Sequence, residues 1–153
     1  MFADLLDQPE SDILEQPQPE EKPTEEPSTI LLIDDDEVHT DVLSRRLKQQ
    51  GFETFVADSA ESGLERAKLE RPSLILLDIR LPDADGLDVC AALADEPETC
   101  TIPVIILSGM DKPNILRRCR AAGSQFFVRK PYDPNALLLL IRQAIQDSLQ
   151  FDL

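Results

Sequence analysis

The chain has 153 residues, of which 42% are hydrophobic, so it can form one domain with an ordinary core and a tail. Its formal net charge of −15 argues against nucleic acid as a direct partner, because binding phosphates requires a basic surface. The chain has no signal-peptide pattern, no apolar run approaching about 18 residues, and no paired-cysteine motif. We therefore expect a cytoplasmic protein with reduced thiols and no membrane contact.

Residues 1–28 differ in composition from the rest of the chain. They contain five prolines, nine acidic residues and one basic residue, Lys22, which gives a net charge of 1 − 9 = −8. Such a segment buries too little apolar surface to offset the entropy lost on ordering, so we predict a disordered leader over 1–28 and a folded domain over 29–153. The similar hexamers DLLDQP (4–9) and DILEQP (12–17) are either a chance product of this composition or a repeated docking motif.

From Thr29 onward, apolar runs alternate with amphipathic stretches. Strands are expected at 30–33, 52–56, 73–77, 103–107 and 125–128. Helices are expected at 37–50, 60–70, 86–95, 112–122 and 134–149, with Gly51 and Gly123 at positions that suit helix C-terminal caps. This alternation predicts βαβ units, and hence an α/β fold with a parallel sheet.

Polar side chains follow the predicted strands at their carboxyl ends, where ligands bind in open α/β sheets. The first strand is followed by three acids at 34–36, the third by Asp78, the fourth by Ser108 and the fifth by Lys130. Clustered carboxylates repel one another unless a cation neutralises them, and oxygen ligands of this kind suit Mg²⁺. A hydroxyl and an ammonium on the other side suit a phosphoryl group, so the pattern indicates phosphoryl-transfer chemistry.

Four motifs in this order resemble the response-regulator receiver domain of two-component signalling. They are IDDD at 33–36, LLDIRLPDADGL at 76–87, VIILSG at 104–109 and FFVRKPY at 126–132. The resemblance covers residues 30–149. It implies a doubly wound, five-stranded parallel sheet in the flavodoxin-like order 2-1-3-4-5, with five helices.

The resemblance also implies a role for each acid. Asp78 matches the phospho-acceptor, whose carboxylate attacks a phosphohistidine. Asp35 matches a direct Mg²⁺ ligand, Asp34 the acid that holds the ion through water, and the backbone carbonyl of Arg80 a further ligand beside Asp78. Asp36 is instead predicted to be an acid at the N-terminus of the following helix, where the helix dipole favours it.

The same resemblance assigns the other side of the site. Ser108 matches a hydroxyl that bonds a phosphoryl oxygen, and Lys130 matches its ion-pair partner. Ser108 and Phe127 are implied to be switch residues. The bond between Lys130 and Pro131 matches one that is cis in this family, although a cis X-Pro bond is otherwise a minority state.

The function implied is that of a signalling protein rather than an enzyme. A histidine kinase or histidine phosphotransfer protein would supply the phosphoryl group. The surface built from 112–122, 125–128 and 134–149 would then change and contact a downstream protein or a second copy of the chain. No nucleic acid or membrane partner is implied.

Several residues carry weaker signals. His39, the sole histidine, is interpreted as a semi-exposed helix residue that is neither a metal ligand nor a phospho-donor. Leu139 is interpreted as an exposed leucine, with a contact role as the alternative. A basic group near the fourth predicted helix could be a solvated face, an output surface or a docking site for the acidic leader; its members are Lys112, Arg117, Arg118, Arg120 and Arg129.

Two alternatives remain. The stretch ILLIDDDEV also resembles the haloacid dehalogenase-type phosphatases, in which Asp34 would be the nucleophile and Asp36 the acid. That family needs a further acidic motif after the lysine, and residues 131–153 do not supply one. The second alternative is that the receiver is the front portion of a longer multidomain regulator.

Overall fold

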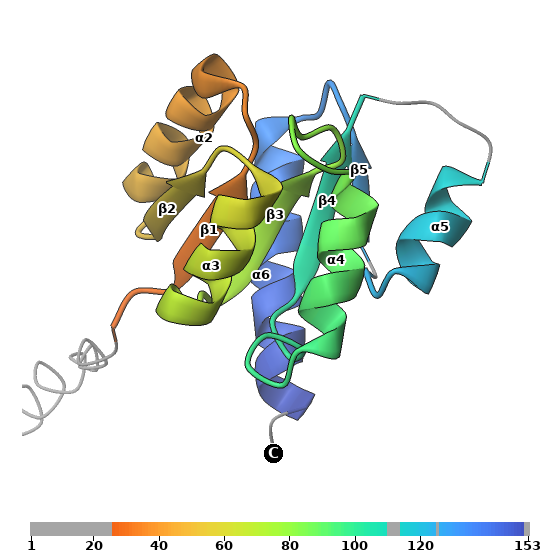
Figure 1. Cartoon of the computed structure of the whole chain (residues 1–153). Helices are drawn as coiled ribbons and strands as arrows, with labels where there is room; N and C mark the ends of the chain where they lie inside the picture. The colour runs from red at the N-terminus through yellow and green to blue at the C-terminus, as the bar shows by residue number, and fades with distance from the viewer. Residues whose placement is uncertain (1–25, 110–113, 125, 152–153) are drawn as a thin grey trace, which may run out of the picture.

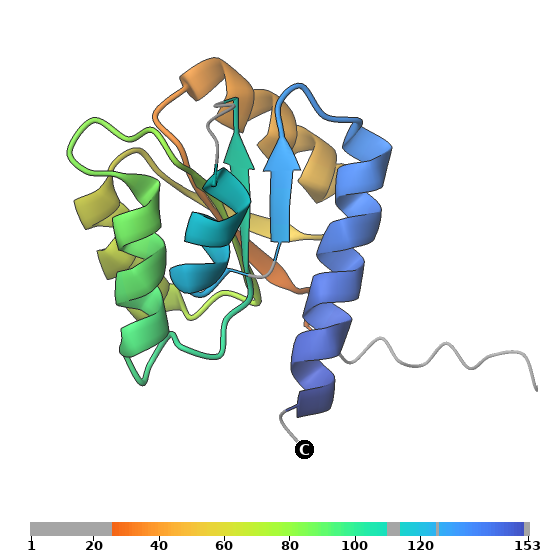
Figure 2. The same ribbon diagram turned by 90° about the vertical axis from the view of Figure 1, so that its right-hand side faces the viewer.

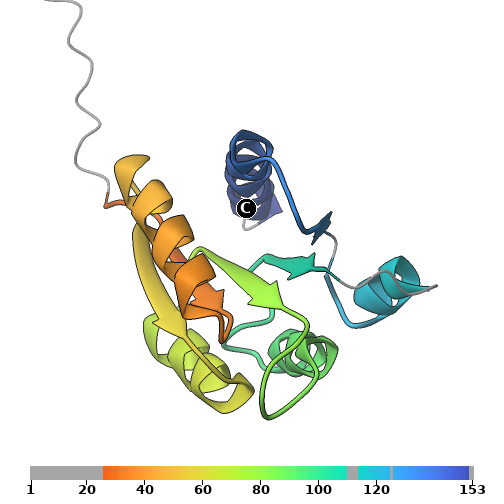
Figure 3. The same ribbon diagram turned by 90° about the horizontal axis from the view of Figure 1, so that it is seen from above.

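A parallel five-stranded sheet forms the centre of the protein in a computed structural model, which describes residues 26–109, 114–124 and 126–151. The sheet order is β2-β1-β3-β4-β5, as Figures 1 and 3 show. The strands are β1 (Thr29–Ile33), β2 (Glu53–Ala57), β3 (Leu74–Asp78), β4 (Val104–Ser108) and β5 (Phe126–Arg129). The predicted fold class and strand order are therefore confirmed.

Five helices connect and cover these strands. They are α2 (Glu37–Gln49), α3 (Ala60–Glu70), α4 (Gly86–Asp95), α5 (Ile115–Ala121) and α6 (Pro134–Phe151). Two of them, α2 and α6, contribute to one hydrophobic cluster, and α3, α4 and α5 contribute to the other (Figures 1 and 2). The predicted helices are all present within a few residues, and 110–113, where the fourth was expected to begin, lie outside the described residues.

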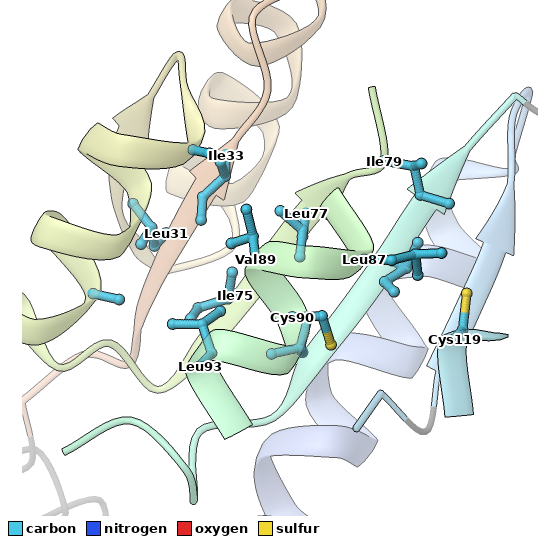
Figure 4. Close-up of a cluster of buried hydrophobic side chains, with 14 of the residues drawn as sticks. Leu31, Ile33, Ile75, Leu77, Ile79, Leu87, Val89, Cys90, Leu93 and Cys119 are labelled. Carbon is cyan, nitrogen blue, oxygen red and sulfur yellow. The ribbon is translucent and has the colours of Figure 1, made fainter. Parts of the chain in front are cut away.

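The central strands alternate between the two clusters because successive side chains in a strand point to opposite faces of the sheet. In β3, Ile75 and Leu77 pack on the α3–α4–α5 side, shown in Figure 4, whereas Leu74 and Leu76 pack on the α2–α6 side. All four are at most 2% exposed. A strand buried on both faces must be apolar throughout, which explains why the middle strands read as continuous hydrophobic runs.

The ends of the helices follow the sequence signals. The side chain of Asp36 accepts hydrogen bonds from the backbone N–H groups of Val38 and His39, so its predicted place at a helix N-terminus is confirmed. Gly51 and Gly123 each follow the C-cap residue of a helix, and their φ values of 96° and 107° suit glycine at that position. The predicted leader lies mainly outside the described residues, and no described helix is long and apolar enough to cross a membrane.

Candidate functional site

Three carboxylates meet at the carboxyl edge of the sheet. Asp34 and Asp35 follow β1, and Asp78 is the last residue of β3; one carboxylate oxygen from each lies within 4.8 Å of the others. The strands β1 and β3 are hydrogen-bonded neighbours, so their ends fall side by side. Asp34 is buried, Asp78 half-buried and Asp35 exposed, which leaves the cluster open to solvent on one side. The oxygen-only donor set fits a hard cation such as Mg²⁺.

Asp34 is held from several directions. Its Oδ1 accepts a hydrogen bond from the backbone N–H of Asp36 at 3.0 Å, and its Oδ2 lies 2.7 Å from Nδ1 of His39. Nζ of Lys130 lies 3.6 Å from the same Oδ2. Burial raises the pKa of Asp34, but the hydrogen bonds from His39 and Asp36 and the charge of Lys130 outweigh it, so the pKa of this carboxyl falls below its ordinary value. These contacts therefore favour the carboxylate form of Asp34.

Asp78 lies in the opposite electrostatic situation. Burial, together with the negative charge of Asp34, raises the pKa of Asp78 despite the attraction of Lys130 and a hydrogen bond from the backbone N–H of Arg80. Nζ of Lys130 lies 3.5 Å from its Oδ2, and the N–H of Arg80 donates to its Oδ1 at 3.3 Å. The charged form of Asp78 thus depends on positive charge in its surroundings.

The other side of the site comes from β4 and β5. Ser108 ends β4 and is buried, and its backbone carbonyl accepts a hydrogen bond from the N–H of Lys130 at 2.8 Å. This bond holds the backbone of Lys130 beside the end of β4, and the side chain of Lys130 extends from there to Asp34 and Asp78. The peptide bond between Lys130 and Pro131 is cis. Phe127 lies in the middle of β5, half-buried against the α3–α4–α5 cluster.

The structure thus brings Asp34, Asp35, Asp78 and Lys130 into one group, and Arg80 into contact with it through its backbone. Ser108 lies next to this group by its place at the end of β4, because its neighbour Leu107 pairs in register with Asp78.

Sequence reasoning missed two residues of this region. His39 does not merely line helix α2, since it contacts Asp34 on one side and Tyr132 on the other. Gly86 begins α4 directly beneath Asp78, and a Cβ there would lie 2.6 Å from Cα of Ile79 and closer still to the carbonyl oxygen of Asp78. The Asp-Gly pair at 85–86 was a possible signal for the glycine, whereas no local pattern indicated the histidine contacts.

Comparison with known proteins agrees with this geometry. The sequence pattern of the family described as "Response regulator receiver domain" matches residues 30–142. The chain belongs to this receiver-domain family. The chain is 31% identical over 123 residues to the response regulator PleD of Caulobacter vibrioides. The aligned residues make up 80% of this chain but only 27% of PleD.

Two further relatives are matched by this chain over almost their whole length. The chain is 28% identical to the polar-differentiation response regulator DivK of Brucella anthropi, over 80% of this chain and 99% of DivK. A CheY-like receiver domain from Methanospirillum hungatei JF-1 has a TM-score of 0.77 at 26% identity, over 81% of this chain and 98% of that structure. Because the chain spans only about a quarter of PleD, the activity of that whole protein says nothing direct about this one.

Membership in the receiver family bears on the two interpretations of ILLIDDDEV. Receiver domains are signalling domains of two-component systems rather than catalysts in the usual sense, and phosphorylation and Mg²⁺ binding are general features of the family. They interact with histidine kinases. The family match covers the acid cluster, Ser108 and Lys130 together, and so favours the receiver over the haloacid dehalogenase-type alternative.

Proposed function

We propose that the chain is a phospho-acceptor that receives a phosphoryl group on Asp78 from a histidine kinase or a histidine phosphotransfer protein. The observation that carries the proposal is the position of Lys130, whose Nζ lies 3.5 Å from Asp78 and 3.6 Å from Asp34 beside a cluster of three carboxylates. This arrangement offers a nucleophile, a fixed cation and oxygen ligands for a metal ion within one small volume.

In the proposed step, a carboxylate oxygen of Asp78 attacks the phosphorus of a phosphohistidine. A bond forms between that oxygen and phosphorus, the bond from phosphorus to the histidine nitrogen breaks, and the released imidazole keeps the electron pair and takes up a proton. Lys130 neutralises charge on the transferred group. The hydroxyl of Ser108, buried at the end of β4, donates a hydrogen bond to a phosphoryl oxygen.

Asp34, Asp35, Asp78 and the carbonyl of Arg80 would hold Mg²⁺, with Asp35 and Asp78 as direct ligands and Asp34 acting through water. When bound, the ion supplies the positive charge that offsets the repulsion among the acids and the incoming phosphoryl oxygens. The raised pKa of Asp78 supports this assignment, because burial and the charge of Asp34 disfavour its carboxylate form and a bound cation would favour it.

The proposed output is a change on the β5 side of the domain. Phosphorylation draws Ser108 toward Asp78, and Phe127, half-buried in β5, turns further inward. The surface of α5, β5 and α6 then contacts a downstream protein or a second copy of the chain. Such a shift in a two-state equilibrium needs only a few kcal/mol of differential interaction.

The test is phosphorylation in vitro with Mg²⁺ and a small acyl-phosphate donor. Intact-mass measurement should show the addition of one phosphoryl group to the wild type and none to Asp78→Asn, which keeps the shape of the side chain and removes the nucleophile. Asp88→Asn, an equivalent change at an exposed position in the first turn of α4, should be modified like the wild type.

Two outcomes would contradict the proposal. Full modification of Asp78→Asn would place the acceptor elsewhere. Repeated turnover of a phosphomonoester, in place of a single stoichiometric acyl phosphate, would favour the phosphatase alternative.

A further inference from the structure

His39, on the first turn of α2, forms a bridge from the loop between β1 and α2, which contains Asp34, to the loop between β5 and α6, which contains Tyr132. Its Nδ1 lies 2.7 Å from Oδ2 of Asp34, and its Nε2 lies 2.6 Å from the hydroxyl of Tyr132. The two rings also meet edge to face, with centroids 5.8 Å apart. Tyr132 is 93 residues away along the chain and belongs to the loop between β5 and α6.

The chemistry of Asp34, His39 and Tyr132 indicates which group donates and which accepts in each of the two hydrogen bonds. Burial, with the nearby charge of Asp34, raises the pKa of Tyr132 to about 12, so the phenol keeps its proton and can donate it. Asp34 is an anion and can only accept. A neutral imidazole completes the chain when Nδ1–H donates to Asp34 and Nε2 accepts from Tyr132. Each group then uses the role that its protonation allows.

The bridge adds to a second tie between the same loops. Lys130 precedes Tyr132 by two residues, and its Nζ reaches the same Oδ2 of Asp34 that faces His39. Oδ1 of Asp34 meanwhile accepts from the N–H of Asp36. The contacts with His39, Lys130 and the N–H of Asp36 therefore fix the orientation of the Asp34 carboxylate. Lys130 lies at the start of the β5–α6 loop.

We propose that His39 is a positioning residue for the metal site, which orients Asp34 through Nδ1 and links that carboxylate to Tyr132 through Nε2. The proposal rests on Mg²⁺ binding at the acid cluster, as proposed above. Removing a group that hydrogen-bonds to a directly ligating residue typically weakens metal affinity about 10- to 100-fold. Asp34 holds the ion through water in the proposed site, so His39 acts one step further out and we expect an effect at the low end of this range. Binding at the cluster is consequently sensed at Tyr132, at the start of the loop that follows Lys130.

The sequence makes the bridge directly observable. His39 is the only histidine and Tyr132 the only tyrosine, and the chain has no tryptophan. Tyrosine emission and the ¹⁵N signals of a histidine-labelled sample therefore each report on one side chain. We expect Mg²⁺ titration of the wild type to change both signals along a single binding curve, and the histidine spectrum at mildly alkaline pH to show the tautomer that carries its proton on Nδ1.

Two substitutions separate the two contacts. In His39→Asn the amide nitrogen occupies the position of Nδ1, so the donor to Asp34 is kept and the reach to Tyr132 is lost. In His39→Gln the amide extends to the position of Nε2, so the reverse holds. We expect His39→Ala to weaken Mg²⁺ binding about tenfold, His39→Gln to behave like it, and His39→Asn to recover most of the affinity without the Mg²⁺-dependent change in tyrosine emission.

Tyr132→Phe tests whether the tyrosine acts through the histidine. It should weaken Mg²⁺ binding slightly in the wild-type background and not at all in His39→Ala, because groups that act in series are not additive. Additive effects, or wild-type affinity in His39→Ala, would overturn the inference while leaving the metal site intact. If the wild type itself binds no Mg²⁺, the proposed function fails first, and the inference falls with it.

Discussion

The two structural units that meet at the site differ in how firmly they are packed. The unit of β3 and α4 carries Asp78 on a strand whose four preceding residues are buried, and α4 buries five of its ten residues. The unit of α5 and β5 leads to Lys130, but β5 is an edge strand with no buried residue, and α5 buries only Ile115 and Cys119 among seven.

This difference in packing suits the two units to different tasks. A nucleophile must keep its position, and Asp78 ends the strand at the centre of the sheet. The element that transmits a signal must be able to move, and regions with few buried contacts have the lowest local stability. The weakly packed α5–β5 unit is therefore the part of the receiver best suited to change when the charge at the site changes.

The largest expected effect is on the free energy of unfolding, when a leucine is shortened in each of the two units. Leu77→Ala, at a fully buried position of β3, should lower the free energy of unfolding by about 3 kcal/mol through lost apolar contacts and a residual cavity. Leu116→Ala, the same change on α5 at a side chain 53% exposed, should alter it by less than about 0.5 kcal/mol. Denaturant unfolding of both variants measures this, and equal losses would remove the distinction.

The second effect concerns the space beneath Asp78. Gly86→Ala forces a Cβ against the backbone of Asp78 and Ile79, so we expect a loss of about 2 kcal/mol in unfolding free energy despite the better helix propensity of alanine. Gly109→Ala is the matched control, because a Cβ at Gly109 meets nothing within 4 Å. If Gly86→Ala is as stable as the control, the end of β3 is less tightly fixed than the structure indicates.

The third effect concerns repulsion within the acid cluster. In the presence of a chelator, Asp35→Asn should raise the free energy of unfolding by about 1 kcal/mol, because one of three neighbouring negative charges is removed. The same variant should lose the stabilisation that Mg²⁺ gives to the wild type. Thermal melts with chelator and with Mg²⁺ measure both changes.

Asp41→Asn provides the control for this experiment. Asp41 lies on α2 with its side chain 70% exposed, outside the acid cluster, so its variant should keep the full response to Mg²⁺. A wild-type response to Mg²⁺ in Asp35→Asn would contradict a shared metal site.

The smallest effect is a change in local opening. Amides of 115–121 and 126–129 should exchange with solvent faster than those of β3, and beryllofluoride, a phosphoryl mimic, should alter their rates a few-fold when Mg²⁺ is present. Amides in β3 should change little. Hydrogen-exchange mass spectrometry measures this, and an unchanged α5–β5 unit would show that the response lies elsewhere in the domain.

Much of the site could be predicted because its residues follow strands directly. Asp34, Asp78 and Ser108 each come at the end of an apolar run, and parallel strands bring such ends to the same edge of the sheet. The position of Asp36 could also be predicted from the nearby sequence, since a capping side chain bonds to backbone groups two or three residues away. The roles of Arg80 and Phe127 followed only from the family resemblance and stay predictions.

The sequence by itself determined the alternation of strands and helices, the two-sided burial of the middle strands and the residues at their carboxyl ends. All of these depend on periodicity and neighbours along the chain. Only the tertiary structure decided that His39 meets Tyr132, and that Gly86 lies against the backbone of Asp78 and Ile79. The physical reason is that these contacts depend on how α2 packs beside the β5–α6 loop and how closely α4 approaches β3. Hydrophobic patterning specifies which face of a helix is buried, but not which polar atoms that burial brings within hydrogen-bonding distance.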